Sequence, residues 1–347
     1  MLATGQRNKS PMNPDGPRQL RSFAARSVFF CLLANVVPLG AQEVPKFAKA
    51  TGVSTPGIQR SMTGLQAQAT FRVGGHPDWM ALNGDSVWVT SSNTNRVTRL
   101  DALTNKVGGF VTIPKPCSGL AIGFGNLWVP SCADHSLVRV DLKTQKIVAT
   151  IPAGPADSEG GITTGAGSVW IVIAPKGELA RIDPSTDRIV AKIEIPSGSY
   201  AAAFADGSVW ITSTGNNLLS RVDPATNKVV STTSVGKAPR FLTVGGGSVW
   251  TLNQGDGTIS RVDTTSGKLV ATIEAGLSGE GGEIAYGEGS VWATLFGFPI
   301  TRIDPATNKV TQQWTGKGGD SIRVGFGSVW LTDLDAGVVW RIDPALR

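Results

Sequence analysis

Short apolar runs alternate with polar turns along most of this chain. The runs are four to six residues long and rich in Val, Ile, Thr and Trp, while the turns are rich in Gly, Asn, Asp and Pro. In one stretch of about 30 residues, the runs are 241–244, 248–252, 259–263 and 268–273. Runs of this length and composition predict β-strands, and no helical period passes through them. Four strands joined by such turns predict one antiparallel sheet.

The same unit recurs seven times. A tryptophan preceded by Val or Leu marks each copy: Trp88, Trp128, Trp170, Trp210, Trp250, Trp292 and Trp330. An Arg-x-Asp sequence follows each one: Arg99/Asp101, Arg139/Asp141, Arg181/Asp183, Arg221/Asp223, Arg261/Asp263, Arg302/Asp304 and Arg341/Asp343. Repeats of about 40 residues with four strands each are typical of propeller blades. The sequence therefore predicts an all-β protein, a seven-bladed β-propeller with four antiparallel strands per blade.

The best preserved phrase of the repeat, Arg-Val-Asp-Pro-Ala-Thr-Asn-Lys at 221–228, predicts the hairpin between the third and fourth strands. Asp accepts hydrogen bonds from the backbone ahead of it, Pro presets φ, and Asn tolerates the left-handed conformation. Arg and Asp two residues apart face the same side of a strand, where they could pair or hold the neighbouring turn. A feature repeated in every blade is structural, so function is expected where the repeat breaks.

The two ends of the repeat region complement each other. The seventh unit stops at residues 341–347, before any fourth strand, whereas residues 69–74 match the fourth strand at 149–154 and have no partner strands before them. We expect the N-terminal strand to complete the last blade, which removes two open sheet edges. The predicted propeller domain is 67–347, and residues 42–66 are interpreted as a linker that wraps the surface or stays loose.

Residues 1–41 differ from the rest. Three arginines precede the apolar run 28–37, and small residues end at Ala41, a pattern that predicts a secretory signal peptide cleaved after Ala41. Met12 is an alternative start. The run is too short for a permanent membrane span, so a periplasmic or secreted protein is expected. Removing this segment lowers the formal net charge from +6 to +2. A nearly balanced mature chain argues against nucleic-acid binding.

Two cysteines, Cys117 and Cys132, remain in the mature chain, both in the second unit. A two-residue turn at 124–125 would place them directly opposite each other on a hairpin, within reach of a disulfide. An oxidising compartment favours that bond. Two free thiols are the alternative.

The sequence lacks the motifs of several common catalytic and cofactor sites. His76 and His135 are the only histidines, so a multi-histidine metal site cannot form. The Gly-x-Gly sequences precede a strand and not a helix, which argues against a dinucleotide loop. No phosphate-binding loop, Gly-x-Ser-x-Gly or Cys-x-x-Cys-His sequence occurs.

Several sequence motifs resemble those of known protein families. DPATNKVV and GSVWITSTGNNLLSRVD resemble the bacterial YVTN-type propeller repeats, and Gly-x-Gly-Ser-Val-Trp resembles the streptogramin (virginiamycin B) lyase group of seven-bladed propellers. The resemblance covers roughly residues 69–347. It implies a histidine general base with an acidic partner near the channel, and a bound magnesium ion. The later units of this chain contain no histidine, so the resemblance carries the fold and not the elimination chemistry.

One position in each unit, ten residues before the tryptophan, varies completely. Its occupants are Asp78, Ser118, Gly160, Tyr200, Arg240, Gly282 and Asp320. They are predicted to surround the channel mouth, where propeller ligands bind. His76, Trp79, Glu159, Glu283 and Arg323 are expected close by. We expect Arg240 to hold a polar ligand by charge-assisted hydrogen bonds, with Tyr200 and Trp79 as walls. Asp78 and Asp320 would be neighbours across the ring closure and could bind a cation or a basic group.

Three functions are compatible with this pattern. We expect a monomeric, non-catalytic binding or scaffold module for a protein, peptide or small polar ligand, with no cofactor, although a divalent cation could sit at the rim. A divergent lyase-like enzyme, a C–O lyase or hydrolase that uses the same face, is the alternative. A quinone-type redox propeller is the third, and no cofactor-stacking repeat supports it. The residue pattern does not name the ligand.

Overall fold

The structure is a computed structural model that describes residues 47–117 and 119–346. These residues belong to one compact unit, Lys46–Arg347. The predicted signal peptide, with its cleavage after Ala41, lies outside the described residues. Within them, no helix has the length and apolar character needed to cross a membrane.

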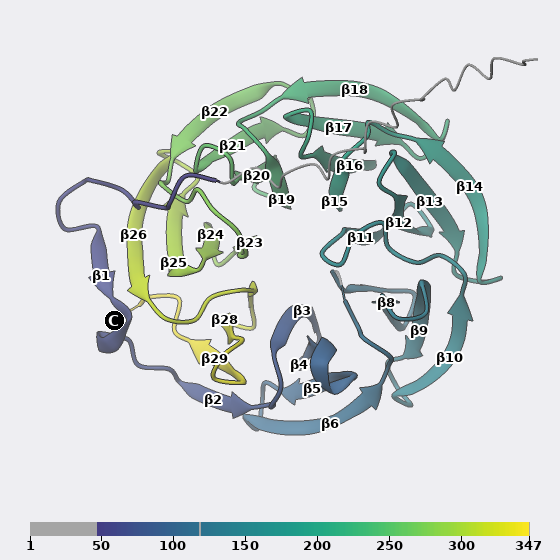
Figure 1. Ribbon diagram of the computed structural model, residues 1–347, viewed down its shortest axis with the longest axis horizontal. Helices are drawn as coiled ribbons and strands as arrows, with labels where there is room; N and C mark the ends of the chain where they lie inside the picture. The colour runs from purple at the N-terminus through teal and green to yellow at the C-terminus, as the bar shows by residue number, and fades with distance from the viewer. Residues whose placement is uncertain (1–46, 118, 347) are drawn as a thin grey trace, which may run out of the picture. The chain divides into compact units, whose positions relative to one another are not determined.

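Seven sheets stand around a central axis, each with its first strand innermost (Figure 1). The first blade contains β3 (Pro77–Asn83), β4 (Ser86–Ser91), β5 (Arg96–Asp101) and β6 (Lys106–Thr112), with the short 3-10 helix η2 (Ser92–Thr94) between β4 and β5. The second contains β7 (Ala121–Gly123), β8 (Asn126–Ser131), β9 (Ser136–Asp141) and β10 (Lys146–Ile151). The third contains β11 (Ile162–Gly165), β12 (Ser168–Ala174), β13 (Glu178–Asp183) and β14 (Arg188–Glu194).

The remaining blades follow the same order. The fourth contains β15 (Ser199–Ala205), β16 (Ser208–Ser213), β17 (Leu218–Asp223) and β18 (Lys228–Ser234). The fifth contains β19 (Pro239–Gly245), β20 (Ser248–Asn253), β21 (Thr258–Asp263) and β22 (Leu269–Glu274). The sixth contains β23 (Glu283–Gly287), β24 (Ser290–Leu295), β25 (Gly297–Asp304) and β26 (Lys309–Gly316). The seventh contains β27 (Ile322–Gly325), β28 (Ser328–Asp333), β29 (Val338–Ile342) and β2 (Ala69–Arg72). The predicted seven-bladed fold is confirmed.

The predicted closure of the ring is also confirmed. Strand β2 pairs antiparallel with β29, and Thr70 lies opposite Trp340 in the register. Phe71 is only 2% exposed, and its ring centroid is 5.7 Å from that of Trp330. Because strands from both ends of the described chain form one blade, the ring has no open join between its first and last blades.

The repeated tryptophans pack the blades against one another. All seven lie on the second strand of their blade and are at most 1% exposed. In five blades the indole Nε1 donates to the carbonyl oxygen of a glycine five residues earlier. That glycine leaves no room for a Cβ: at Gly165 the space is filled by Phe204, and at Gly245 by Tyr286, each from the next blade. The Gly-x-Gly sequence therefore serves close packing between blades.

Six of the seven repeated arginines hold the turn of the following blade. Arg181 lies over the ring of Trp170 and donates from Nη1 to the carbonyl oxygen of Pro224 at 2.7 Å and to Oδ1 of Asn227 at 2.9 Å. Arg139, Arg221, Arg261, Arg302 and Arg341 make corresponding bonds. Of the two roles considered for this arginine, these six have the bond to the neighbouring turn, whereas Arg99 in the first blade forms ion pairs with Asp85 at 3.4 Å and with Asp101 at 4.0 Å. The Asp of the repeat accepts from backbone N–H groups inside its own turn.

Residues before the propeller run along the sixth blade. Strand β1 (Gln59–Ser61) adds to β26 as a parallel fifth strand, and the 3-10 helix η1 (Met62–Gly64) follows it. The side chain of Gln313 accepts from the backbone N–H of Val53 at 2.8 Å, which fixes the preceding segment. This segment covers the edge of one outermost strand.

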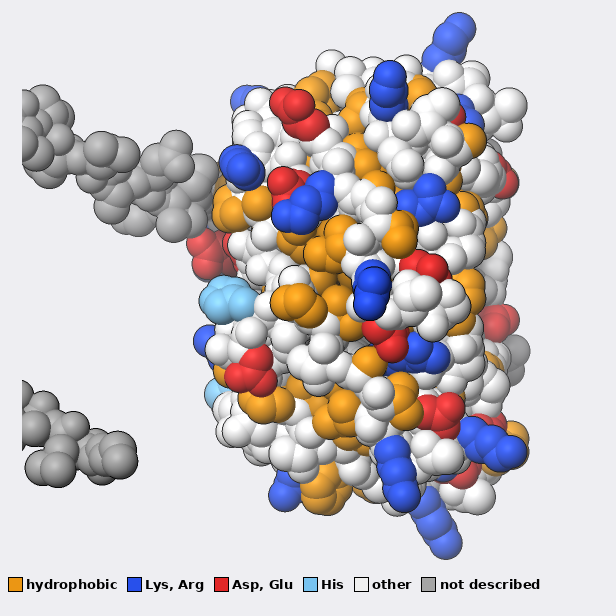
Figure 2. All heavy atoms as spheres, turned by 90° about the vertical axis from the view of Figure 1, so that its right-hand side faces the viewer, with side chains coloured by type: hydrophobic (Ala, Val, Ile, Leu, Met, Phe, Trp, Pro, Cys, Tyr) orange, Lys and Arg blue, Asp and Glu red, His pale blue; other side chains and the backbone are white. Residues whose placement is uncertain are grey.

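The outer wall of the ring is chemically mixed. Figure 2 shows the side that includes β14, where hydrophobic side chains lie among basic and acidic ones. Valines of the outer strands are exposed, such as Val148 on β10 by 53% and Val190 on β14 by 55%. Scattered apolar side chains of this kind are ordinary on a soluble surface. The wall is therefore a weaker candidate for a specific site than the axis of the ring.

Candidate ligand site at the channel mouth

Two aromatic side chains meet near the axis of the ring. Trp79 on β3 and Phe241 on β19 come from the first and fifth blades, and their ring centroids are 5.7 Å apart in an edge-to-face arrangement. Tyr200 on β15 packs against Phe241 at 5.8 Å. Trp79 is 7% exposed and Phe241 is 3% exposed. We call these three buried rings the aromatic floor, because Phe241 contacts both of the others near the axis.

One charged cluster joins three blades. Arg240 on β19 forms an ion pair with Glu159, which lies on the loop before β11, and donates from Nη2 to the Tyr200 hydroxyl at 2.7 Å. That hydroxyl in turn donates to Oε2 of Glu159 at 3.2 Å. Burial raises the pKa of the Glu159 carboxyl, and the guanidinium of Arg240 opposes that rise. The charge of Arg240 is thus matched by a carboxylate of the same chain.

A second charged cluster is more deeply buried. Glu283 on β23 is 4% exposed and forms an ion pair with Arg323 on β27. Its Oε2 also accepts from the Ser321 hydroxyl at 2.6 Å and from the backbone N–H of Ile322 at 3.2 Å. Burial raises the pKa of Glu283, and Arg323 opposes this. Arg323 also lies 6.0 Å from the Trp79 ring centroid, so this pair supports the aromatic floor from one side.

Asp78 and Asp320 form the third cluster. Asp78 belongs to β3 and Asp320 precedes β27, so the predicted neighbours across the ring closure do meet. Burial, the charge of Asp320 and a hydrogen bond with Asp320 raise the pKa of Asp78 well above its ordinary value. Burial also raises the pKa of Asp320, while the hydrogen bond from Asp78 and a backbone N–H from Gly282, at 3.2 Å, oppose the rise. Two adjacent carboxyl groups that share a hydrogen bond retain one proton more readily than isolated ones.

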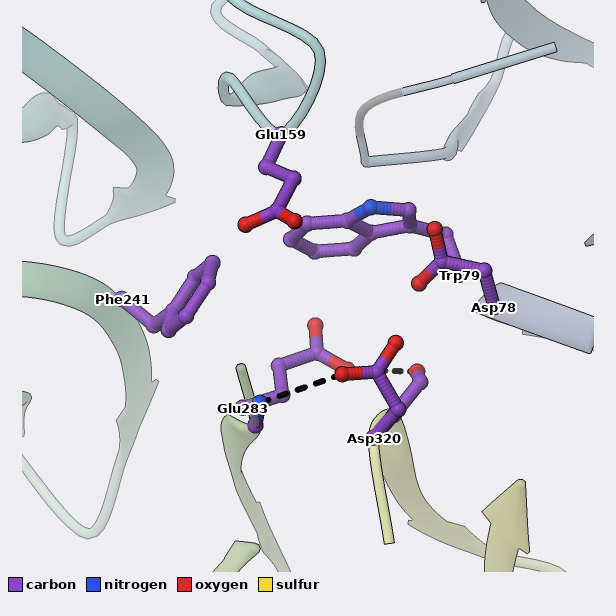
Figure 3. Close-up of a pocket in the computed structure, with 8 residues that line it drawn as sticks. Asp78, Trp79, Glu159, Phe241, Glu283 and Asp320 are labelled. Carbon is purple, nitrogen blue, oxygen red and sulfur yellow. Dashed lines mark hydrogen bonds between the residues drawn. The ribbon is translucent and has the colours of Figure 1, made fainter. Parts of the chain in front are cut away.

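The three clusters surround one small cavity. It is lined by Asp78, Trp79, Glu159, Phe241, Gly282, Glu283, Asp320 and Ser321. Figure 3 shows the carboxyl groups of Glu159 and Asp78 next to the ring of Trp79, those of Glu283 and Asp320 together on the other side of the space, and Phe241 at its edge. The cavity measures about 10 Å³, enough for about one water molecule. A group of that size with several hydrogen-bond donors would fit the space.

The structure brings together most of the residues expected at the mouth. Five of the nine line the cavity: Asp78, Trp79, Glu159, Glu283 and Asp320. Tyr200, Arg240 and Arg323 contact these residues directly. His76 is exposed, and its backbone N–H bonds to the side chains of Ser91 and Asn93. It does not line the cavity.

Phe241 and Ser321 were missed by the sequence reasoning, although a signal for them exists. Both stand nine residues before a repeated tryptophan, one position after the variable ring that we singled out. The occupants of this second ring are Trp79, Gly119, Gly161, Ala201, Phe241, Glu283 and Ser321. Its two aromatic members are the two that meet near the axis.

A disulfide joins Cys117 and Cys132, with their Cα atoms 5.9 Å apart. Next to the turn, β7 and β8 keep the expected register. Farther along, Pro116 pairs with Ser131, which is a shift of two residues. The expectation that the cysteines lie directly opposite each other is therefore wrong: they lie diagonally across this bridge, and the bond spans the diagonal. The loop after Cys117 approaches the site, because the N–H of Gly119 donates to the carbonyl oxygen of Gly160 at 3.0 Å.

The magnesium ion that the resemblance implies finds no matching set of ligands here. Within residues 47–117 and 119–346, no group of three or more His, Cys, Asp and Glu side chains is arranged to hold a metal ion. Glu159 and Glu283 are committed to arginines, and Asp78 and Asp320 are hydrogen-bonded to each other. The side chains as arranged do not fit a hydrated divalent cation.

Comparison with known proteins identifies the fold. No protein-family model and no curated protein matches the chain. A solved streptogramin B lyase is 19% identical, covers 85% of this chain and 96% of its own, and superposes with a TM-score of 0.66. Virginiamycin B lyase from Staphylococcus aureus is 20% identical over 77% of this chain and 94% of its own, with a TM-score of 0.64. A catalytically inactive variant of that lyase with quinupristin is 18% identical over 85% and 98%, with a TM-score of 0.66. The chain therefore has a streptogramin lyase-like propeller fold.

Proposed function

We propose that this protein is a non-catalytic binding module whose channel mouth receives a primary ammonium group. The observation that carries the proposal is the distribution of charge around the cavity. Glu159 and Glu283 are each paired with an arginine, whereas neither Asp78 nor Asp320 forms an ion pair with a basic side chain in the described part of the chain. A cation placed between these two aspartates would supply the missing positive charge.

The size and walls of the cavity favour an ammonium group over other cations. A cavity of about 10 Å³ accepts a group about as large as water, whereas a guanidinium is larger. The three N–H donors of an ammonium match the carboxyl groups that converge there (Figure 3). The face of Trp79 attracts a cation placed above it. The ligand would therefore be a small amine, or a peptide that offers a lysine or a free N-terminus.

This proposal changes the role expected for Arg240. Its guanidinium is bound to Glu159 and Tyr200, and it lies over the Tyr200 ring at 4.9 Å. Direct binding of a ligand by Arg240 would leave the half-buried Glu159 without its cation, at a cost in free energy. We therefore assign Arg240 to positioning: it holds Glu159 at the edge of the cavity.

Calorimetric titration with 1-aminohexane tests the proposal, with hexan-1-ol as the neutral control. We expect the amine to bind at pH 7 and the alcohol not to bind. Binding should weaken as the pH falls, because the raised pKa of Asp78 means that the aspartate pair then keeps its protons. The double variant Asp78→Asn/Asp320→Asn should lose binding, while Glu280→Gln, which removes one carboxyl group at an exposed residue that does not line the cavity, should retain it. Equal binding of amine and alcohol would contradict the proposal.

Export from the cytoplasm belongs to the same proposal. The disulfide between Cys117 and Cys132 supports it, because such bonds persist in oxidising compartments. Mass spectrometry of the protein from its native source would test both points, through the mass of the mature N-terminus and the mass change on reduction.

A lyase-like activity is the second candidate, because three solved structures of similar fold are lyases or a lyase variant. One of them is inactivated by replacing a histidine. In this chain both histidines, His76 and His135, are exposed, and neither lines the cavity. We therefore expect no ring opening when quinupristin is incubated with the protein and magnesium and then separated by chromatography. Turnover that survives in the double variant His76→Ala/His135→Ala would revive an enzyme function that uses the carboxyl groups.

A further inference from the structure

The mouth end of the second blade is built differently from that of three other blades. In the first, fourth and fifth blades, the innermost strand is seven residues long, starts eleven residues before the repeated tryptophan and pairs there with the second strand. In the second blade, β7 is only three residues long, and one isolated bridge joins Pro116 to Ser131. Cys117 stands eleven residues before Trp128. Its disulfide to Cys132 therefore joins the two segments where the other three blades use a continuous strand.

The segment that follows Cys117 touches two walls of the cavity at the mouth. The N–H of Gly119 donates to the carbonyl oxygen of Gly160 at 3.0 Å, and Gly160 comes directly after Glu159. A Cβ at Gly119 would lie 3.6 Å from the ring of Trp79, an ordinary contact distance, so the backbone of this glycine lies beside that ring. Trp79 and Glu159 both line the cavity, and Figure 3 shows them next to each other. The disulfide thus holds a segment that is in contact with the candidate site.

We propose that the bond between Cys117 and Cys132 sets the affinity of the mouth for an ammonium group, and that reduction of this bond weakens binding. The inference rests on the proposed function, because it concerns the cation placed between Asp78 and Asp320. With the bond closed, Gly119 is fixed beside the wall of the cavity. With the bond open, the segment gains conformational freedom, and ordering it again when the ligand binds costs free energy.

Reduction of the bond requires a dithiol as the electron donor. A thiolate of the dithiol attacks one sulfur, the S–S bond breaks, and the second sulfur of the dithiol then releases the mixed disulfide. The protein gains two electrons and two protons and carries two thiols, while the dithiol becomes a cyclic disulfide. Cys132 is half-buried and Cys117 is 4% exposed, so access favours attack at Cys132. By linkage, a ligand that binds the oxidised form more tightly makes the bond harder to reduce by the same factor.

Calorimetric titration of 1-aminohexane into oxidised and reduced protein at pH 7 tests the inference. We expect the affinity to fall about tenfold after reduction with dithiothreitol, within the usual range of coupling between two sites, and to recover when the bond forms again. The double variant Cys117→Ala/Cys132→Ala should bind as weakly as the reduced protein and should not respond to dithiothreitol. The melting temperature of each form would show that it is folded.

A second measurement distinguishes control of affinity from a purely structural role of the bond. The midpoint of its reduction is measured in mixtures of reduced and oxidised dithiothreitol, with and without saturating 1-aminohexane. A coupling of about tenfold corresponds to a midpoint about 30 mV more negative with the amine, because the bond takes up two electrons. Hexan-1-ol should cause no shift. The double variant Asp78→Asn/Asp320→Asn should show no shift with the amine.

The possible results separate the two proposals. If both forms bind the amine equally and the midpoint does not move, the bond only stabilises the fold: this inference is wrong and the ammonium site at the mouth stands. If dithiothreitol also weakens binding to the double variant without cysteines, the reductant and not the bond is responsible, and the inference is again wrong. If neither form binds the amine, the proposed function fails, and this inference fails with it.

Discussion

Replacing Phe71 tests whether the N-terminal strand is an integral part of the ring. Phe71 is 2% exposed and packs against Trp330 inside the seventh blade. Truncation of a fully buried phenylalanine to alanine costs about 3–5 kcal/mol in unfolding free energy. An unfolding entropy of about 2.1 cal/mol/K per residue over roughly 280 residues gives about 0.6 kcal/mol per degree. Phe71→Ala should therefore lower the melting temperature by about 5–8 °C.

The matched control is Phe110→Ala, the same substitution on the outermost strand β6 of the first blade. Phe110 is 52% exposed and contacts the guanidinium of Arg96, so its loss should cost only about 0.5–1 kcal/mol. The assay is differential scanning calorimetry of both variants and the parent at one pH and one scan rate. Equal shifts for the two variants would refute the reasoning, because Phe71 would then contribute no more than a surface residue.

Three further predictions concern the site and its supports. Asp78→Asn should raise the free energy of unfolding at pH 7, measured with urea, and should have little effect near pH 3. The pKa of Asp78 is raised, so the folded protein holds this proton more tightly than the unfolded chain does. The stability of the parent therefore falls as the pH rises above the ordinary aspartate pKa, and the variant avoids that loss. The same difference in unfolding free energy between variant and parent at pH 3 and pH 7 would contradict this prediction. Reducing the bond between Cys117 and Cys132, 15 residues apart, should cost up to about 3 kcal/mol; identical unfolding with and without reductant would mean that the bond does not form. Arg323→Met should lower the free energy of unfolding by about 3–5 kcal/mol at neutral pH, because it leaves Glu283 buried without its cation. The loss should be smaller at pH 4, where Glu283 takes up a proton. An equal loss at both pH values would argue against that cause.

The fold could be predicted because each of its constraints is repeated. A tryptophan is buried on the second strand of each blade, and six of the seven blades have an arginine that holds the next turn, so the period of about 40 residues exposes both without any alignment. Ring closure was predictable for a similar reason: residues 69–74 match a strand type whose place in the last blade is missing. Local patterns define these elements, and their partners lie at fixed distances in the sequence.

The register at the disulfide could not be predicted in the same way. The turn at 124–125 correctly fixes the pairing close to it, but a two-residue shift lies between that turn and Pro116. Such a shift depends on how the loop before β7 packs against the neighbouring blade, where Gly119 bonds to Gly160. The sequence of the hairpin alone does not contain that contact.

The side-chain contacts in the candidate site could be predicted only in part, because they join different blades. Because strands of a propeller begin at equivalent heights around one axis, the aligned ring position predicted that Asp78 and Asp320 lie close together, as they do. Which charges neutralise one another is a different question, since Arg240 meets Glu159 from two blades away and Trp79 meets Phe241 across the ring. These contacts depend on side-chain length and on the width of the channel, and no period in the sequence reports either quantity.

The low sequence identity to the solved lyases is consistent with two kinds of positions: repeated ones that build the ring and variable ones that line the mouth. A common ring is compatible with 18–20% identity, because blade packing constrains only part of the sequence. The residues that line the mouth are free of that constraint, and here they combine two satisfied Arg–Glu pairs with one pair of aspartates that share a hydrogen bond. A carboxyl pair that faces a cavity and lacks a cation is costly for folding, and such a cost is often retained where a ligand relieves it. This excess negative charge, more than the fold, is the reason to look for an amine.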